Sequence, residues 1–107
     1  MAYYLVQAAY TSQAWQAMVK SPQNRMDAIR PVVEKLGGKV EGAWLAFGEY
    51  DAIVICQMPD DVSAAAFSMA ASAGGAVKAV KTTPLMTIEQ AMEAMKKAGG
   101  TGYRPPS

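Results

Sequence analysis

The chain contains 107 residues, and its hydrophobic fraction of 51% suffices for one ordinary globular core, while the length leaves no room for a second domain. Ten basic and nine acidic residues give a formal charge of +1, so the chain as a whole does not attract polyanions. We therefore expect neither nucleic acid nor an anionic membrane as a partner. The absence of histidine excludes Ser-His and Cys-His nucleophiles and removes the commonest metal ligand.

Cys56 is the only cysteine, so the chain can form neither an internal disulfide nor a multi-cysteine metal site. This usage is typical of a reducing compartment, and we expect a cytoplasmic protein that needs no metal and no cofactor. Because Cys56 lies in an apolar run, we expect a small buried hydrophobic residue rather than a reactive thiol.

The N-terminal part alternates signals for strand and helix. Residues 3–10 (YYLVQAAY) are rich in aromatic and branched side chains and predict a strand, and Thr11 and Ser12 offer hydroxyls that can cap a following helix. Ser21-Pro22 suits the start of a renewed helix, which Gly37-Gly38 can end. The apolar residues of this second helix follow helical spacing: Met26, Ile29, Val33 and Leu36.

Two strands and a turn follow. Residues 39–47 (KVEGAWLAF) alternate well enough for a half-buried strand, and residues 52–56 (AIVIC) form a continuous apolar strand typical of the centre of a sheet. Gly48 to Asp51 turn the chain between them, and glycine before an aspartate-containing turn is what a tight reversal requires. We therefore expect the two strands to pair as a hairpin.

The C-terminal part predicts a helix, a strand and a last helix. Asp60 or Asp61 can cap a helix that Gly74-Gly75 end, and residues 76–86 (AVKAVKTTPLM) resume strand character. Thr87 begins the last helix, with Gln90 three residues later in the spacing of a capping box. One stripe of that helix is apolar, formed by Ile88, Ala91, Met92 and Met95.

The order of these elements, βαββαβ with an added helix, predicts an α+β fold of the ferredoxin-like type with a four-stranded antiparallel sheet. Residues 1–98 form the single domain, including the C-terminal helix, and residues 99–107 form a Gly- and Pro-rich tail. Because helices cover only one side of such a sheet, we expect a second copy to close the other side.

The segment FGEYDAIVI, with Gly48, Glu49, Tyr50 and Asp51, resembles the turn for which the GYD-domain family of small bacterial proteins is named. Further segments similar to that family follow in order along nearly the whole chain: YTSQAW, SPQNRMDAIRP, LGGKVEGAW, MPDDVSAAAFSMAASAGGAVKAVKTTPL and GYRPP. The resemblance implies a ferredoxin-like domain that associates through its sheet, as dimeric α+β-barrel proteins do. It implies no established reaction.

The turn Gly48 to Asp51 has two interpretations. Turn chemistry alone explains the glycine and the aspartate, and this structural interpretation is favoured. In the functional interpretation, the Tyr50 phenol and the Asp51 carboxylate project into a cleft and orient or deprotonate a small ligand. Tyr10 and Trp44 could line the same pocket, although large aromatic side chains more often pack in a core or an interface.

Arginine residues of the second predicted helix give a weaker signal. Arg25 and Arg30 lie close in sequence to Asp27 and Glu34, and the spacing within a helix favours ordinary surface ion pairs. An anion clamp is the alternative for these arginines.

Two classes of function follow from these residues. The first is a homo-oligomeric module, a homodimer or a multiple of dimers, that binds a small apolar or aromatic ligand between sheet and partner. The second is a cofactor-independent enzyme resembling the small monooxygenases and isomerases of the dimeric α+β-barrel type, with Asp51 as base or Tyr50 as hydrogen-bond donor.

Overall fold

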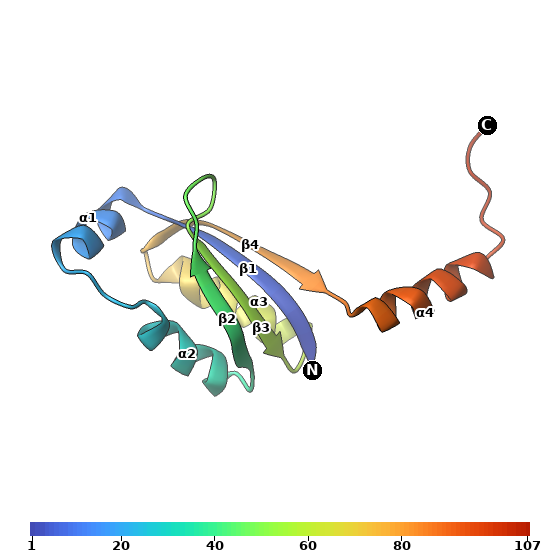
Figure 1. Cartoon of the computed structure of the whole chain (residues 1–107), viewed down its shortest axis with the longest axis horizontal. Helices are drawn as coiled ribbons and strands as arrows, with labels where there is room; N and C mark the ends of the chain where they lie inside the picture. Colours follow the sequence, from blue (N-terminus) through green and yellow to red (C-terminus); the bar gives the residue numbers. More distant parts are fainter.

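The computed structural model describes residues 1–107 as a four-stranded antiparallel sheet with four helices (Figure 1). The elements are β1 (Ala2–Tyr10), α1 (Ser12–Lys20), α2 (Met26–Lys35), β2 (Lys39–Leu45), β3 (Ala52–Met58), α3 (Asp61–Ala73), β4 (Val77–Leu85) and α4 (Ile88–Gly99). The strand order is β2-β3-β1-β4, so β1 and β3 are central and β2 and β4 are the edges. This arrangement confirms the predicted α+β fold with βαββαβ order.

The core lies between one face of the sheet and the helices α2 and α3. Strand alternation sends Tyr4 and Val6 of β1 to this face, next to their neighbours Cys56 and Val54 of β3. Further core residues are Val33 of α2, Val40 of β2, Met58 of β3, and Ala64 and Phe67 of α3. Cys56 is buried, as predicted, and this burial raises the pKa of its thiol, so it packs as an apolar side chain.

The other face of the sheet carries apolar side chains that no core residue covers. Residues opposite each other in a ladder share a face, and on this face Leu5 lies between Ile55 and Thr83. Trp44 lies opposite Ile53, and Tyr3 lies opposite Leu85. None of these six side chains is buried, and Trp44 is 60% exposed. We call this surface the open face: Tyr3, Leu5, Trp44, Ile53, Ile55 and Leu85.

Local capping signals predicted most element boundaries correctly. The side chain of Thr11 caps α1 by accepting from the backbone N–H of Ala14, and Asp60 caps α3 by accepting from that of Ser63. Thr87 and Gln90 form the predicted capping box of α4. The β2–β3 hairpin is also confirmed, although β2 ends at Leu45 rather than at Phe47.

The predicted start of the second helix at Ser21-Pro22 is wrong. Residues 21–25 form a connecting loop, and α2 begins at Met26. The Asn24 side chain accepts a hydrogen bond from the backbone N–H of Met26 at 3.0 Å, so the helix start is fixed four residues beyond Pro22. The loop therefore separates α1 from α2.

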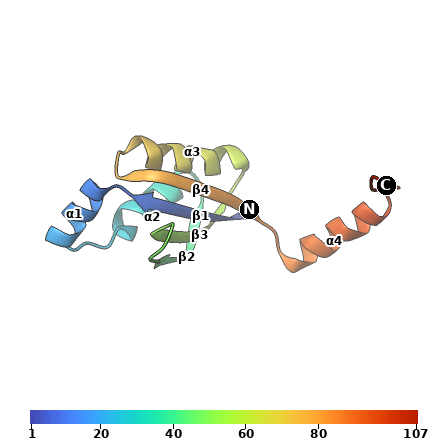
Figure 2. The same ribbon diagram turned by 90° about the horizontal axis from the view of Figure 1, so that it is seen from above.

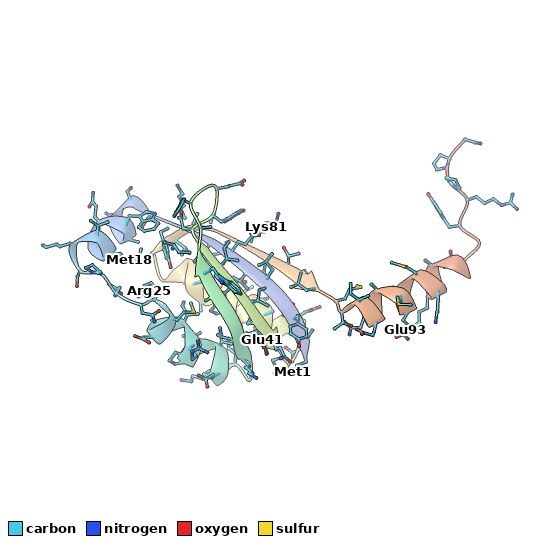
Figure 3. All side chains as sticks on the ribbon, viewed as in Figure 1. Met1, Met18, Arg25, Glu41, Lys81 and Glu93 are labelled. Atoms are coloured by element: carbon cyan, nitrogen blue, oxygen red, sulfur yellow. The ribbon has the colours of Figure 1, made fainter.

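Helix α4 projects away from the sheet and the other helices (Figure 2). None of its residues is buried, and its side chains stand clear of the sheet (Figure 3). The predicted apolar stripe, which includes Ile88, Met92 and Met95, stays largely exposed. None of the helices combines the length and the apolar character that crossing a membrane requires.

The Tyr4 hydroxyl donates a hydrogen bond to the Asp61 carboxylate and so ties β1 to the start of α3. This bond, together with burial, raises the pKa of Tyr4 to about 12 from 10.0. The neutral phenol is thus favoured in the folded state, and its contribution to stability is complete below pH 10 and lost as pH rises toward 12.

Replacing Tyr4 with Phe should therefore lower stability at neutral pH, and the difference from the unaltered protein should shrink between pH 10 and 12. Urea unfolding followed by circular dichroism across this range measures both curves. A stability difference that stays constant up to pH 12 would contradict the assignment of the raised pKa to Tyr4.

Candidate functional site

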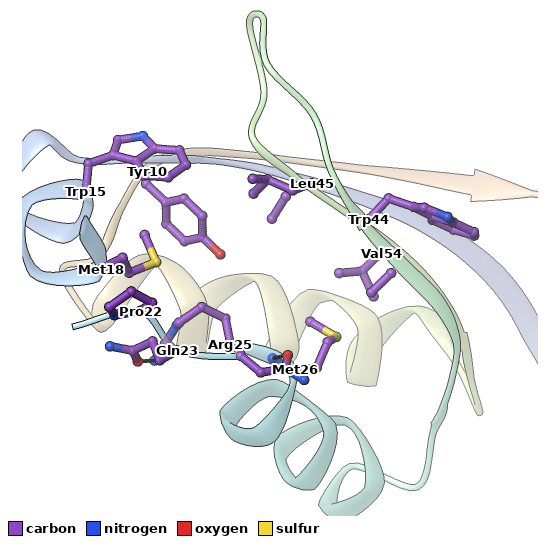
Figure 4. A pocket seen from close by; sticks show the side chains of 13 residues that line it. Tyr10, Trp15, Met18, Pro22, Gln23, Arg25, Met26, Trp44, Leu45 and Val54 are labelled. Atoms are coloured by element: carbon purple, nitrogen blue, oxygen red, sulfur yellow. Dashed lines mark hydrogen bonds between the residues drawn. The ribbon is translucent and has the colours of Figure 1, made fainter. Parts of the chain in front are cut away.

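A cavity of about 350 Å³ opens on the helix side of the sheet (Figure 4). Its walls come from α1, the 21–25 loop, the start of α2 and the β2–β3 hairpin. The lining is mostly apolar and includes Trp15, Met18, Met26 and Val54. We call this cavity the Arg25 pocket, because Arg25 is the only charged residue in its lining.

Tyr10 sits at the end of β1 and forms one wall of this pocket. The ladder between β1 and β4 shifts register between Ala9 and Tyr10, and α1 starts two residues later. This short connection places Trp15 edge-on against the Tyr10 ring, with centroids 5.4 Å apart and an interplanar angle of 84°. The Tyr10 hydroxyl points into the pocket, toward the segment that carries Arg25 and Met26 (Figure 4).

Burial raises the pKa of Tyr10, and the Asp51 carboxylate acts in the same direction, whereas the charge of Arg25 acts against it. The net effect is a raised pKa, so the phenol is protonated at neutral pH. Tyr10 can therefore donate a hydrogen bond into an apolar space.

A second cavity of about 230 Å³ adjoins the Arg25 pocket and lies between α2, α3 and the sheet. The two cavities share lining residues: Tyr10, Arg25, Met26, Ala52 and Val54. Its remaining lining is almost entirely apolar, with Phe67 and Val80 among the residues. An apolar space therefore extends from the 21–25 loop to α3, with Tyr10 and Arg25 at the junction.

Trp44, the second aromatic residue predicted for the pocket, borders it but points elsewhere. Its indole extends away from Tyr10 (Figure 4) and lies over Gly42, where an added Cβ would stand 2.7 Å from Cη2 of the ring. The structure therefore does not bring the Trp44 indole and the Tyr10 ring together, and Trp44 belongs to the open face.

Tyr50 and Asp51 lie in the hairpin loop 46–51 and line neither cavity. Asp51 is engaged by the backbone: its N–H donates to Ala8 O at 2.8 Å, its carbonyl accepts from Ala46, and its carboxylate accepts from the Tyr10 N–H at 2.9 Å. The carboxylate thus holds the hairpin against β1 where the β1–β4 register shifts. This placement supports the structural interpretation of the turn.

Glycine at position 48 is not required by this turn, contrary to the prediction. Its φ is not positive, and an added Cβ would meet no atom within 4 Å. Asp51 is the residue that holds this turn in place, through its hydrogen bonds to the backbone.

Replacing Asp51 with Ala should destabilise the fold by about 1–3 kcal/mol, because the Tyr10 N–H would lose its acceptor at a partly buried site. Asp51→Asn keeps an acceptor oxygen and should cost less than half as much. Chemical unfolding of both variants measures the difference. Equal stability of the alanine variant and the unaltered protein would contradict the structural role of Asp51.

The surface ion pairs predicted for Arg25 and Arg30 are wrong for both residues. The structure contains two ion pairs, Lys39–Glu41 and Glu93–Lys97, and neither involves Arg25 or Arg30. The Arg25 guanidinium donates to the Gln23 side chain at 3.2 Å. Sequence reasoning also missed Trp15, Met18 and Met26 as pocket residues, because helical spacing alone does not show which side chains face a cavity.

A family model described as GYD domain matches residues 4–95 of the chain. None of the curated proteins matches it. The matched range runs from within β1 through β4 to most of α4 and includes the hairpin loop that contains Gly48, Tyr50 and Asp51. The chain therefore belongs to the GYD-domain family.

Proposed function

We propose that the chain is a homo-oligomeric domain whose open face is covered by a second copy, and that each domain binds a small apolar or aromatic molecule. The ligand was first expected between the sheet and the partner. The cavities favour a site on the opposite, helix side of the sheet.

The observation that carries the assembly is the open face. Its six apolar side chains come from all four strands and form one continuous surface across the sheet. Monomeric proteins rarely expose large contiguous apolar patches, because burying such surface in an interface is favourable. A second copy offers the same surface, and two identical sheets can pack face to face about a twofold axis.

Two further exposed features support association. Phe47, in the hairpin loop, is 96% exposed. The apolar stripe of α4 has no partner within its own chain, and a helix of 12 residues is only marginally stable in water without packing. Both features would gain stability by contact with another copy.

The alternative, a cofactor-independent enzyme that uses Tyr50 and Asp51, gains no support from this geometry. The Asp51 carboxylate is occupied by the Tyr10 N–H, and neither residue lines a cavity. A general base needs free access to the proton that it removes.

Sedimentation velocity of the purified chain across micromolar concentrations tests the assembly. We expect the mass of a dimer or of a multiple of dimers, because the open face would otherwise remain in water. A species with the mass of one chain at all these concentrations would overturn the proposal.

A further inference from the structure

Arg25 is a cation without an anionic partner at the junction of two apolar cavities. Its side chain is half-buried, and its guanidinium donates to the neutral amide oxygen of Gln23. The charge of Arg25 and a hydrogen-bonding interaction with the Tyr10 phenol also act to lower the pKa of Tyr10. A guanidinium has five N–H donors in a planar fork, so most of its hydrogen-bonding capacity is unused by the protein. Partial burial of a charge is costly unless a partner compensates it.

Tyr10 provides a second donor beside this cation. Its hydroxyl points into the pocket (Figure 4), and the charge of Arg25 is close enough to act on the phenol. Apart from Gln23 and Asn24 of the 21–25 loop, the rest of the lining is apolar and includes Met18, Met26 and Val54. Polar donors therefore gather at one side of an otherwise apolar space, an arrangement typical of small-molecule sites.

We propose that the Arg25 pocket binds a small monocarboxylic acid, whose carboxylate accepts hydrogen bonds from Arg25 and Tyr10 and whose aromatic or branched aliphatic body packs on Met18, Met26 and Val54. This inference rests on the ligand-binding part of the proposed function and names the class of ligand. A carboxylate matches the planar fork of arginine with two parallel hydrogen bonds.

The charge and the volume of the Arg25 pocket narrow the class of ligand further. Arg25 is the only cation in the lining, and the Asp51 carboxylate lies near enough to Tyr10 to raise its pKa. The Asp51 carboxylate repels a dianion such as hydrogen phosphate more strongly than a monoanion, and the single positive charge of Arg25 balances only a monoanion. A volume of about 350 Å³ is at the lower end for ligand pockets, which favours a compact body such as one aromatic ring.

Isothermal titration with benzoate and with its neutral analogue benzamide tests the proposal on the unaltered full-length chain. We expect benzoate to bind with a Kd on the order of millimolar, as its small size allows, and benzamide to bind at least about tenfold more weakly. Backbone amide shifts in NMR should change at Tyr10 and Met26. Equal binding of the two compounds, or no binding of benzoate, would overturn the proposal.

Arg25→Gln should reduce benzoate affinity at least about tenfold and remove the preference over benzamide. Arg30→Gln is the matched control, since it removes an exposed arginine of α2 that lines neither cavity. Arg25→Lys keeps the charge but loses the fork, so an intermediate affinity is expected. Unchanged benzoate binding in a folded Arg25→Gln protein would exclude Arg25 as the anion partner.

Two measurements on the same samples test the ligand site and the proposed assembly independently. Sedimentation reports the oligomer, and titration reports the pocket. A monomer that binds benzoate more tightly than benzamide would overturn the proposed assembly and support the proposed ligand site. An oligomer that binds the two compounds equally would support the assembly and overturn the ligand site.

Discussion

Replacing Leu5 with glutamate is expected to dissociate the oligomer that we propose. Leu5 lies in the central strand β1, opposite Ile55 on one side and Thr83 on the other, at the middle of the open face. A carboxylate at this point would be buried without a partner when a second sheet covers it, and burial of an unpaired charge is strongly unfavourable. In a twofold interface the substitution also occurs twice.

Substitution of a hot-spot residue at the centre of an interface costs about 2 kcal/mol or more, so we expect the dissociation constant to rise at least about 30-fold. Sedimentation velocity should then show the single chain at concentrations where the unaltered protein is associated. The folded state should persist, since the side chain of residue 5 faces water in the separated domain, and circular dichroism checks this.

Val62→Glu is the matched control for Leu5→Glu. Val62 is an exposed apolar residue in the first turn of α3, on the other side of the sheet, where a carboxylate is favourable to the helix dipole. This variant should associate like the unaltered protein. If Leu5→Glu associated as strongly as Val62→Glu, the open face would not be the interface.

The fold could be predicted from sequence because its signals are local and agree with one another. The helix caps at Thr11, Asp60 and Thr87 each depend on one side chain and a backbone N–H within three residues. Alternation of apolar residues then identified the strands, and the order of elements left few topologies. The one wrong helix start came from Pro22, which suits a first helical position but here lies in a loop.

The candidate site was less predictable from the sequence, because it depends on the register of the strands and on the 21–25 loop. The irregular pairing between Val40 and Gly42 puts Trp44 on the open face, and no sequence pattern marks it. Tyr10 lies on the helix side, as simple alternation from Tyr4 and Val6 along β1 gives.

Arg25 precedes α2 and has no acidic residue three or four positions away. Arg30 has Asp27 and Glu34 at those spacings but forms no ion pair, because spacing alone adds little attraction between exposed charges.

Two glycine-to-alanine substitutions are expected to give opposite results. At Gly38, a Cβ would stand 2.3 Å from Sδ of Met58 and 2.5 Å from the carbonyl oxygen of Gln57. Met58 is fully buried and the Gln57 oxygen belongs to the backbone of β3, so neither can move away easily. Gly38→Ala should therefore destabilise the protein by about 1–3 kcal/mol or more, through overpacking where α2 leads into β2.

At Gly48, in the turn that characterises the family, alanine fits without strain, because the space around it is open and φ is not positive. Gly48→Ala should range from no change to a gain of about 1 kcal/mol, since alanine restricts the unfolded chain more than glycine does. Thermal unfolding of both variants in parallel measures the contrast. If Gly48→Ala lost much stability and Gly38→Ala lost none, this expectation would be wrong. Glycine would then be required in the hairpin loop and not at the close contact of Gly38 with β3.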